Sequence, residues 1–154
     1  MRTAPLKTGE TLPALDLVAT DGSAFEIEPL LTAGSLVVYF MRTPTCPVCH
    51  SHLRQMGRAR IDGHPLVDRL LVIVPGDARD AASVARRRAE LSGRIVASTT
   101  AHAAVGLFTR AALQQSGTFV VGSDSTVLSA RFSTVPLGAY DEGEVTAALA
   151  VAMQ

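Results

Sequence analysis

The strongest constraint on the fold lies in residues 36–50, where an apolar run is followed by two cysteines. Residues 36–41 are rich in β-branched and aromatic side chains and predict a buried strand. Pro47 suits the first position of a helix, because the N–H that proline lacks would have no intrahelical partner there. The sequence therefore predicts a strand, a short loop and a helix, with Cys46 at the helix N-cap and Cys49 in the first turn.

The spacing of the two cysteines predicts a reversible disulfide. Three residues apart in a helical turn, Cys46 and Cys49 present both sulfurs to one face. A helix N-terminus and nearby cations favour a thiolate, and Arg42, His50 and the hydroxyls of Thr43 and Thr45 are close in sequence. A purely stabilising disulfide would gain little from closing so short a loop. We therefore expect Cys46 to be the nucleophile and Cys49 the resolving thiol.

Two metal-centred interpretations also match this segment. Residues 46–50 read Cys-x-x-Cys-His, the signature of covalent haem attachment, but residues 1–15 contain no continuous apolar core of an export signal. A zinc site would need four convergent ligands, and the available set is crowded into two helical turns: Cys46, Cys49, His50 and His52. We predict no bound cofactor and no metal.

Composition narrows the class of protein. With 154 residues, of which 47% are hydrophobic, the chain can build one sizeable core, and we predict a single domain over residues 1–154. Its 14 Lys and Arg balance 14 Asp and Glu, so charge gives no sign of nucleic-acid or membrane binding. No apolar stretch is long enough to span a bilayer. With two cysteines and no export signal, we expect a cytoplasmic protein.

Strands and helices alternate along the predicted order of elements. They are a hairpin within residues 15–27, the central strand and cysteine helix, a strand at 70–74, a helix from an Asp77 cap to about Leu91, a strand at 94–97, a short helix capped by Thr100, a hairpin within 118–132, and a last helix opened by Asp141 and Glu144. Such alternation implies parallel strand pairs, to which the closing hairpin adds an antiparallel pair. We therefore predict an α/β fold with a mixed central sheet and helices on both faces.

This arrangement around a Cys-Pro-x-Cys helix start resembles the thioredoxin fold. The N-terminal hairpin, with residues 9–13 and Asp21-Gly22, and the added strand–helix unit before residues 117–121 are more specifically similar to the peroxiredoxin-like family (alkyl hydroperoxide reductase and thiol-specific antioxidant, AhpC/TSA). The resemblance covers nearly the whole chain. It implies a thiol-dependent antioxidant oxidoreductase.

The family's motif is Pro-x-x-x-Thr/Ser-x-x-Cys, whose Thr and Cys fall here on Thr43 and Cys46, with Tyr39 at the proline position. By this resemblance, Thr43 would form a hydrogen bond at the thiolate and at the attacked oxygen.

The family also carries an arginine before the later hairpin strand, near residues 115–117, where this chain has none. Arg42 or Arg110 would have to replace it in space. The proline that thioredoxins carry just before that strand is missing as well. We therefore expect a peroxidase slower than a typical peroxiredoxin, with Arg42, Thr43, Cys46 and Cys49 as its site residues.

The expected reaction begins with attack by Cys46 on a peroxide O–O bond or a disulfide sulfur, and Cys49 then resolves the intermediate as an intramolecular disulfide. The resemblance implies a cellular dithiol reductant such as a thioredoxin, and it allows a homodimer. Two alternatives stay open. One is a thioredoxin-like thiol-disulfide reductase without peroxidase activity, and the other is a non-enzymatic module that senses oxidation or binds zinc.

Overall fold

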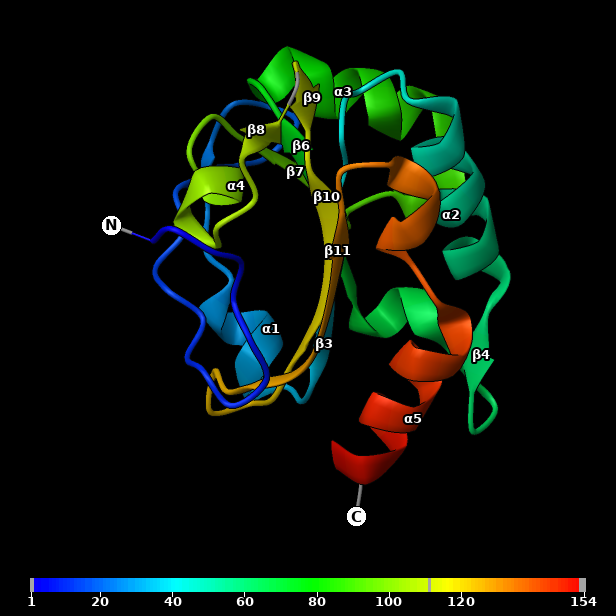
Figure 1. The fold of residues 1–154 in the computed structure, drawn as a ribbon. Helices are drawn as coiled ribbons and strands as arrows, with labels where there is room; N and C mark the ends of the chain where they lie inside the picture. The colour runs from blue at the N-terminus through cyan, green and yellow to red at the C-terminus, as the bar shows by residue number, and fades with distance from the viewer. Residues whose placement is uncertain (1, 111, 153–154) are drawn as a thin grey trace.

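A seven-stranded mixed sheet forms the centre of the computed structural model, which describes residues 2–110 and 112–152 (Figure 1). The strands, in the order in which they lie across the sheet, are β11 (Val127–Ser133), β10 (Ser116–Val121), β3 (Leu36–Phe40), β6 (Leu70–Pro75), β7 (Ile95–Ser98), β1 (Leu17–Val18) and β2 (Ala24–Phe25). β3, β6 and β7 run parallel, and the other neighbouring pairs are antiparallel. The predicted mixed sheet is confirmed, with its N-terminal hairpin at one edge.

Helices cover both faces of this sheet, as predicted (Figure 1). The helices are α1 (Glu28–Thr32), α2 (Pro47–Arg58), α3 (Ala78–Arg87), α4 (Ala101–Ala104) and α5 (Glu142–Ala152), with 3-10 turns η1 (Leu66–Arg69), η2 (Ala89–Leu91) and η3 (Pro136–Ala139). α2, α3 and α5 pack on one face, and α1 and α4 pack on the other. None of the helices within the described ranges is long and apolar enough to cross a membrane.

The central strand β3 is buried on both sides because its alternate residues serve two cores. Val37 and Tyr39 face the core under α2, α3 and α5. Val38 and Phe40 face the core under α1 and α4. Burying an apolar side chain of this size stabilises a fold by about 1.5–3 kcal/mol, so the strand that precedes the cysteine loop is firmly anchored.

The start of α3 follows the sequence prediction, but its end does not. Asp77 accepts a hydrogen bond from the Asp80 N–H, and the Asp80 carboxylate accepts one from the Asp77 N–H, which completes a capping box. The helix ends at Arg87, because the backbone leaves the helical region at Arg88, and η2 continues the chain to Leu91. This change of direction brings Leu91 fully into the core.

The cap of α4 also differs from the prediction. Thr100 occupies the N-cap position, but its side chain makes no capping hydrogen bond. The Ser98 hydroxyl instead accepts hydrogen bonds from the N–H groups of Thr100 and Ala101, at 3.1 and 2.9 Å. A serine at the end of β7 therefore fixes the start of this helix.

Two short ribbons were not predicted. β4 (Arg60–Ile61) pairs with β5 (His64–Pro65), and β8 (Thr109–Arg110) pairs with β9 (Leu113–Gln114). The first ribbon turns at Asp62 and Gly63, which both have positive φ. Asp-Gly is a favoured pair for such a two-residue turn, so this pair could have predicted the ribbon from the sequence.

A buried histidine joins α4 to the end of β3. His102 is 5% exposed, and its Nε2 lies 2.7 Å from the Met41 carbonyl oxygen. Its ring packs edge-on against Phe40, with the ring centroids 5.0 Å apart. Burial lowers the pKa of His102 to about 4, although the Met41 carbonyl opposes this shift.

This burial predicts a loss of stability in mild acid. The pKa of His102 is about 4 in the folded state and 6.5 in the unfolded state. The neutral ring therefore contributes its full share to the free energy of unfolding above pH 6.5, and this share is lost as the pH falls from 6.5 toward 4. Full protonation would lower the free energy of unfolding by about 3 kcal/mol. His102→Gln keeps an N–H for the Met41 carbonyl but has no titrating ring, so its unfolding free energy should fall less. Urea unfolding of both proteins between pH 7.5 and 4 measures this difference, and parallel pH curves would contradict it.

Candidate active site

The loop after β3 ends at the N-cap of α2, as the sequence predicts. Cys46 is the N-cap residue and Pro47 begins the helix. The Cys46 Sγ accepts a hydrogen bond from the Cys49 backbone N–H, at 3.3 Å between S and N. The sulfur thus occupies the position in which a capping oxygen commonly satisfies a free N–H at a helix start.

The second cysteine lies deeper in the protein. Both Cys46 and Cys49 are free thiols, and they are 2% and 0% exposed. The Arg42 backbone N–H donates to the Cys49 Sγ at 3.4 Å. One turn of helix therefore places the two sulfurs in different surroundings.

Those surroundings shift the two thiol pKa values in opposite directions. Burial raises the pKa of Cys46, but hydrogen bonds from the thiol and backbone N–H of Cys49, with the Arg42 side chain, outweigh it and leave this pKa below its usual value. Burial raises the pKa of Cys49 to about 12, and the hydrogen bond with Cys46 raises it as well. Cys46 is therefore the better thiolate, and Cys49 retains its proton.

Of the two arginines considered from the sequence, Arg42 lies beside Cys46. Its side chain lowers the pKa of Cys46, both as a hydrogen-bond donor close to the sulfur and through its positive charge. The Arg110 guanidinium instead lies over the Phe108 ring, 5.9 Å from the ring centroid. A positive charge next to the sulfur can stabilise both the thiolate and the charge that develops when an O–O bond breaks.

Thr43 contacts Cys46 through its backbone. The Cys46 N–H donates to the Thr43 carbonyl at 3.4 Å, which tightens the loop before the helix. Within residues 2–110 and 112–152, no hydrogen bond joins the Thr43 hydroxyl to either sulfur. Its role as a donor to the reacting oxygen stays a prediction.

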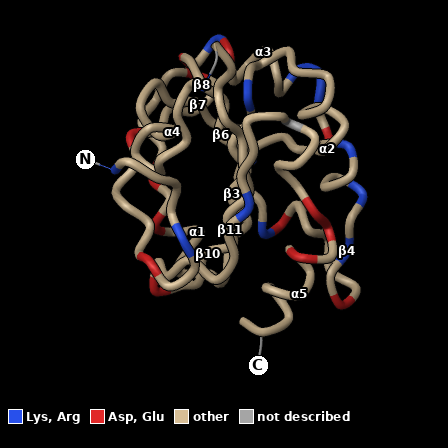
Figure 2. The backbone as a smooth tube through the Cα atoms, viewed as in Figure 1, with Lys and Arg blue, Asp and Glu red and all other residues tan. Residues whose placement is uncertain are grey.

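The His50 side chain contacts the loop that precedes α2. Its ring is buried, and its Nε2 lies 2.8 Å from the Pro44 carbonyl oxygen. Burial lowers the pKa of His50; the Pro44 carbonyl opposes this, while the charges of Arg87, Arg88 and Arg54 lower it further. Basic residues gather along α2 and α3 (Figure 2). A neutral His50 can donate its Nε2–H to Pro44 and so hold the loop in place.

The candidate zinc ligands do not converge. His50 is engaged with Pro44, whereas the Nδ1 of His52 lies 2.8 Å from the Tyr39 hydroxyl. Among the described residues, no group of three or more His, Cys, Asp or Glu side chains is placed to bind a metal ion. The Nε2 of His50 is likewise occupied by the Pro44 carbonyl oxygen, which leaves a haem attached to Cys46 and Cys49 only the buried Nδ1 as an axial ligand.

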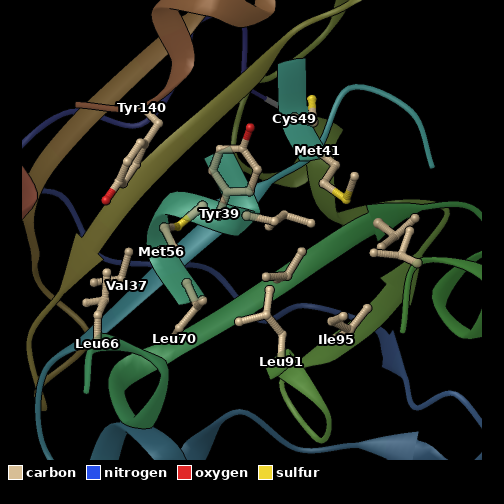
Figure 3. Close-up of a cluster of buried hydrophobic side chains, with 14 of the residues drawn as sticks. Val37, Tyr39, Met41, Cys49, Met56, Leu66, Leu70, Leu91, Ile95 and Tyr140 are labelled. Atoms are coloured by element: carbon tan, nitrogen blue, oxygen red, sulfur yellow. The ribbon is translucent and has the colours of Figure 1, made fainter. Parts of the chain in front are cut away.

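An aromatic cluster behind Cys49 was not predicted from the sequence. Tyr39 from β3, His52 from α2 and Tyr140 from the segment before α5 pack together, with ring centroids 5.5–6.4 Å apart. In Figure 3 the Tyr39 hydroxyl points toward the turn that carries Cys49. The available signal was a tyrosine inside an otherwise apolar strand and a histidine three residues after Cys49.

No protein-family model matches the sequence, and no curated protein matches it. The peroxidoxin BcpB from Mycobacterium tuberculosis is 21% identical, with a TM-score of 0.68, covering 95% of this chain and 97% of the other. A peroxiredoxin-like protein from Aquifex aeolicus is 13% identical, with a TM-score of 0.71, covering 96% and 88%. A thiol peroxidase from Chromobacterium violaceum is 13% identical, with a TM-score of 0.70, covering 97% and 89%.

These similarities extend over nearly the whole chain. The chain has the thioredoxin fold in the form found in peroxiredoxin structures, as its sequence predicts.

The Arg42 side chain should control the ionisation of Cys46. Replacing it in Arg42→Met removes the hydrogen bond and the positive charge, so the Cys46 pKa should rise. Iodoacetamide labelling at a series of pH values, read by mass spectrometry, should show Cys46 modified first in the native protein and only at higher pH in the variant. Arg110→Met is the matched control and should leave the profile unchanged. Labelling of Cys49 before Cys46 would reverse the assignment.

Proposed function

We propose that this protein is a thiol peroxidase in which Cys46 reduces the peroxide and Cys49 resolves the oxidised sulfur. The observation that carries this proposal is the placement of the two thiols: the Cys46 sulfur accepts an N–H at the N-cap of α2, and Cys49 is fully buried one turn later. This placement shifts the two thiol pKa values in opposite directions. An activated thiolate next to a protonated thiol is what a two-step reduction needs. The similarity to solved peroxiredoxin structures supports the same choice at the level of the fold.

The reaction would proceed in three steps. The Cys46 thiolate attacks one peroxide oxygen, so that an S–O bond forms, the O–O bond breaks, and the leaving oxygen takes up a proton to depart as water or an alcohol. Cys49 loses its proton and attacks the Cys46 sulfenic acid, forming the S–S bond and releasing water. A dithiol of the thioredoxin class then reduces the disulfide by thiol-disulfide exchange.

The neighbouring residues would support the first step in different ways. Arg42 supplies the positive charge that the sequence lacks at the family's usual arginine position. Thr43 would donate or accept a hydrogen bond at the attacked oxygen once the peroxide is bound. Losing one such preorganised donor commonly costs about 10²-fold or more in rate.

A second candidate is a thiol-disulfide reductase without peroxidase activity. It is favoured by the Thr43 side chain, which has no hydrogen bond to either sulfur within the described residues. The low Cys46 pKa would serve this reaction equally well, because a stabilised thiolate is also a good leaving group.

A non-enzymatic redox or zinc module is the third candidate. Metal analysis and an absorption spectrum of the purified protein test it. Stoichiometric zinc with thiols that resist alkylation would reject the peroxidase proposal.

The proposed reaction also needs an electron donor and a cellular compartment that supplies it. The electron donor would be a cellular dithiol such as a thioredoxin, and the cytoplasm would supply it. A homodimer stays a prediction that rests on the family resemblance.

Stopped-flow oxidation of the reduced protein by hydrogen peroxide and by an organic hydroperoxide, beside its reaction with a model disulfide, tests the function. We expect peroxide oxidation of Cys46 to be much faster than that of a free thiol, though slower than in a typical peroxiredoxin. Thr43→Val should lower the peroxide rate about 10²-fold and affect the disulfide rate much less. Thr45→Val alters an exposed threonine of the same loop and should change neither rate. Peroxide rates no faster than those of a free thiol, with rapid disulfide exchange, would favour the reductase instead.

A further inference from the structure

The resolving cysteine presents a chemical problem that the two-cysteine scheme leaves open. Cys49 is fully buried, and burial keeps its proton in place. Only a thiolate attacks sulfur efficiently, so this proton must leave before the disulfide can form. Bulk water has little access to a side chain with 0% exposure. A proton acceptor inside the protein would remove this barrier.

The Tyr39 hydroxyl lies where such a path would begin. Tyr39 is itself fully buried on β3, and its hydroxyl lies close enough to the Cys49 sulfur to lower the pKa of that thiol. In Figure 3 its hydroxyl points toward the helical turn that carries Cys49. Because burial raises the pKa of Tyr39 far above its usual range, the hydroxyl passes a proton on without remaining ionised.

His52 completes the path on the other side of the hydroxyl. Its Nδ1 lies 2.8 Å from the Tyr39 oxygen, and it occupies the same helix as Cys49, three residues later. Burial lowers its pKa, so the ring is neutral at neutral pH and can accept a proton. His52 keeps 5% of its surface exposed, which gives the proton an exit.

We propose that Tyr39 and His52 form a proton relay that deprotonates Cys49 for disulfide formation. Once Cys46 is oxidised and is no longer a thiolate that accepts the Cys49 proton, the Cys49 S–H donates to the Tyr39 oxygen, and the Tyr39 O–H donates to His52 Nδ1. After transfer, Nδ1–H donates to the Tyr39 oxygen, whose O–H donates to the thiolate. One proton has moved from sulfur to imidazole, and the imidazolium then releases it to solvent. Tyr39 contacts the reacting thiol, whereas His52 acts through Tyr39.

The surroundings of the relay leave few competing groups. Besides His52, the titratable groups that raise the pKa of Tyr39 are Cys46 at the N-cap of α2, Cys49 in its first turn and Tyr140 from the segment before α5. Within the described residues, burial alone lowers the pKa of His52, and no charged side chain there shifts it. Tyr140 packs against both rings, but its own hydroxyl has no hydrogen-bond partner in the described structure. Tyr140 therefore packs against the relay residues without giving the proton a second route.

This inference rests on the proposed function, so its test is built to work without a peroxide. The reduced protein is mixed in a stopped-flow instrument with one equivalent of 4,4′-dithiodipyridine at about pH 6.5–8.5. Attack by Cys46 forms a mixed disulfide and releases the first thiopyridone. Attack by Cys49 on the Cys46 sulfur forms the protein disulfide and releases the second. The second phase thus reports on Cys49 alone, whatever the rate of Cys46 with peroxide.

In the native protein the second phase should depend weakly on pH, because an internal base removes the proton. Tyr39→Phe breaks the relay and should slow this phase about 10²-fold or more near pH 7. Its rate should then rise about tenfold per pH unit, as expected when hydroxide must remove the proton. The first phase should be almost unchanged.

Two further variants separate proton transfer from packing. His52→Asn can keep a hydrogen bond to Tyr39 at the Nδ1 position but cannot accept a proton near neutral pH, so it should show the same steep pH dependence. Tyr140→Phe removes a hydroxyl from the same cluster and should leave both phases unchanged. A flat pH profile in Tyr39→Phe or His52→Asn, or an equal loss in Tyr140→Phe, would overturn the relay. Failure of peroxide to oxidise Cys46 would overturn only the peroxidase proposal.

Discussion

The hydrogen bond from the Cys49 backbone N–H to the Cys46 sulfur is the interaction on which the site depends. It exists because Pro47 begins α2 directly after Cys46, so the sulfur meets a first-turn N–H that has no partner within the helix. The same turn that stabilises a thiolate at Cys46 carries Cys49 into the core, where charge is unfavourable. One local feature of the backbone thus shifts the pKa values of two chemically similar side chains in opposite directions.

Two buried histidines keep the loop before this turn in place. His102 bonds to the Met41 carbonyl from one side of the sheet, and His50 bonds to the Pro44 carbonyl from α2. Burial lowers the pKa of both rings, so both are neutral at neutral pH and can donate Nε2–H to a carbonyl. The loop position that brings Arg42 to Cys46 therefore depends on contacts from both faces of the sheet.

Local patterns predicted the parts of this structure that local chemistry determines. The strand before the cysteines, the N-cap at Cys46 and the cap at Asp77 follow from neighbouring residues and are confirmed. Contacts between distant elements were not predictable in the same way. Tyr39 contacts His52 only because α2 folds back over β3. Ser98, and not Thr100, caps α4 because the end of β7 places its hydroxyl next to the Ala101 N–H.

The central claim is that the start of α2 separates the ionisation of two cysteines three residues apart. NMR titration of the reduced protein, labelled with ¹³C at the cysteine β carbons, measures both groups in one sample. The account predicts that the Cys46 signal shifts at a pH below the usual cysteine pKa of about 8.5. The Cys49 signal should stay that of a thiol throughout the range in which Cys46 ionises. Ionisation of both thiols at the same pH, or of Cys49 before Cys46, would contradict it.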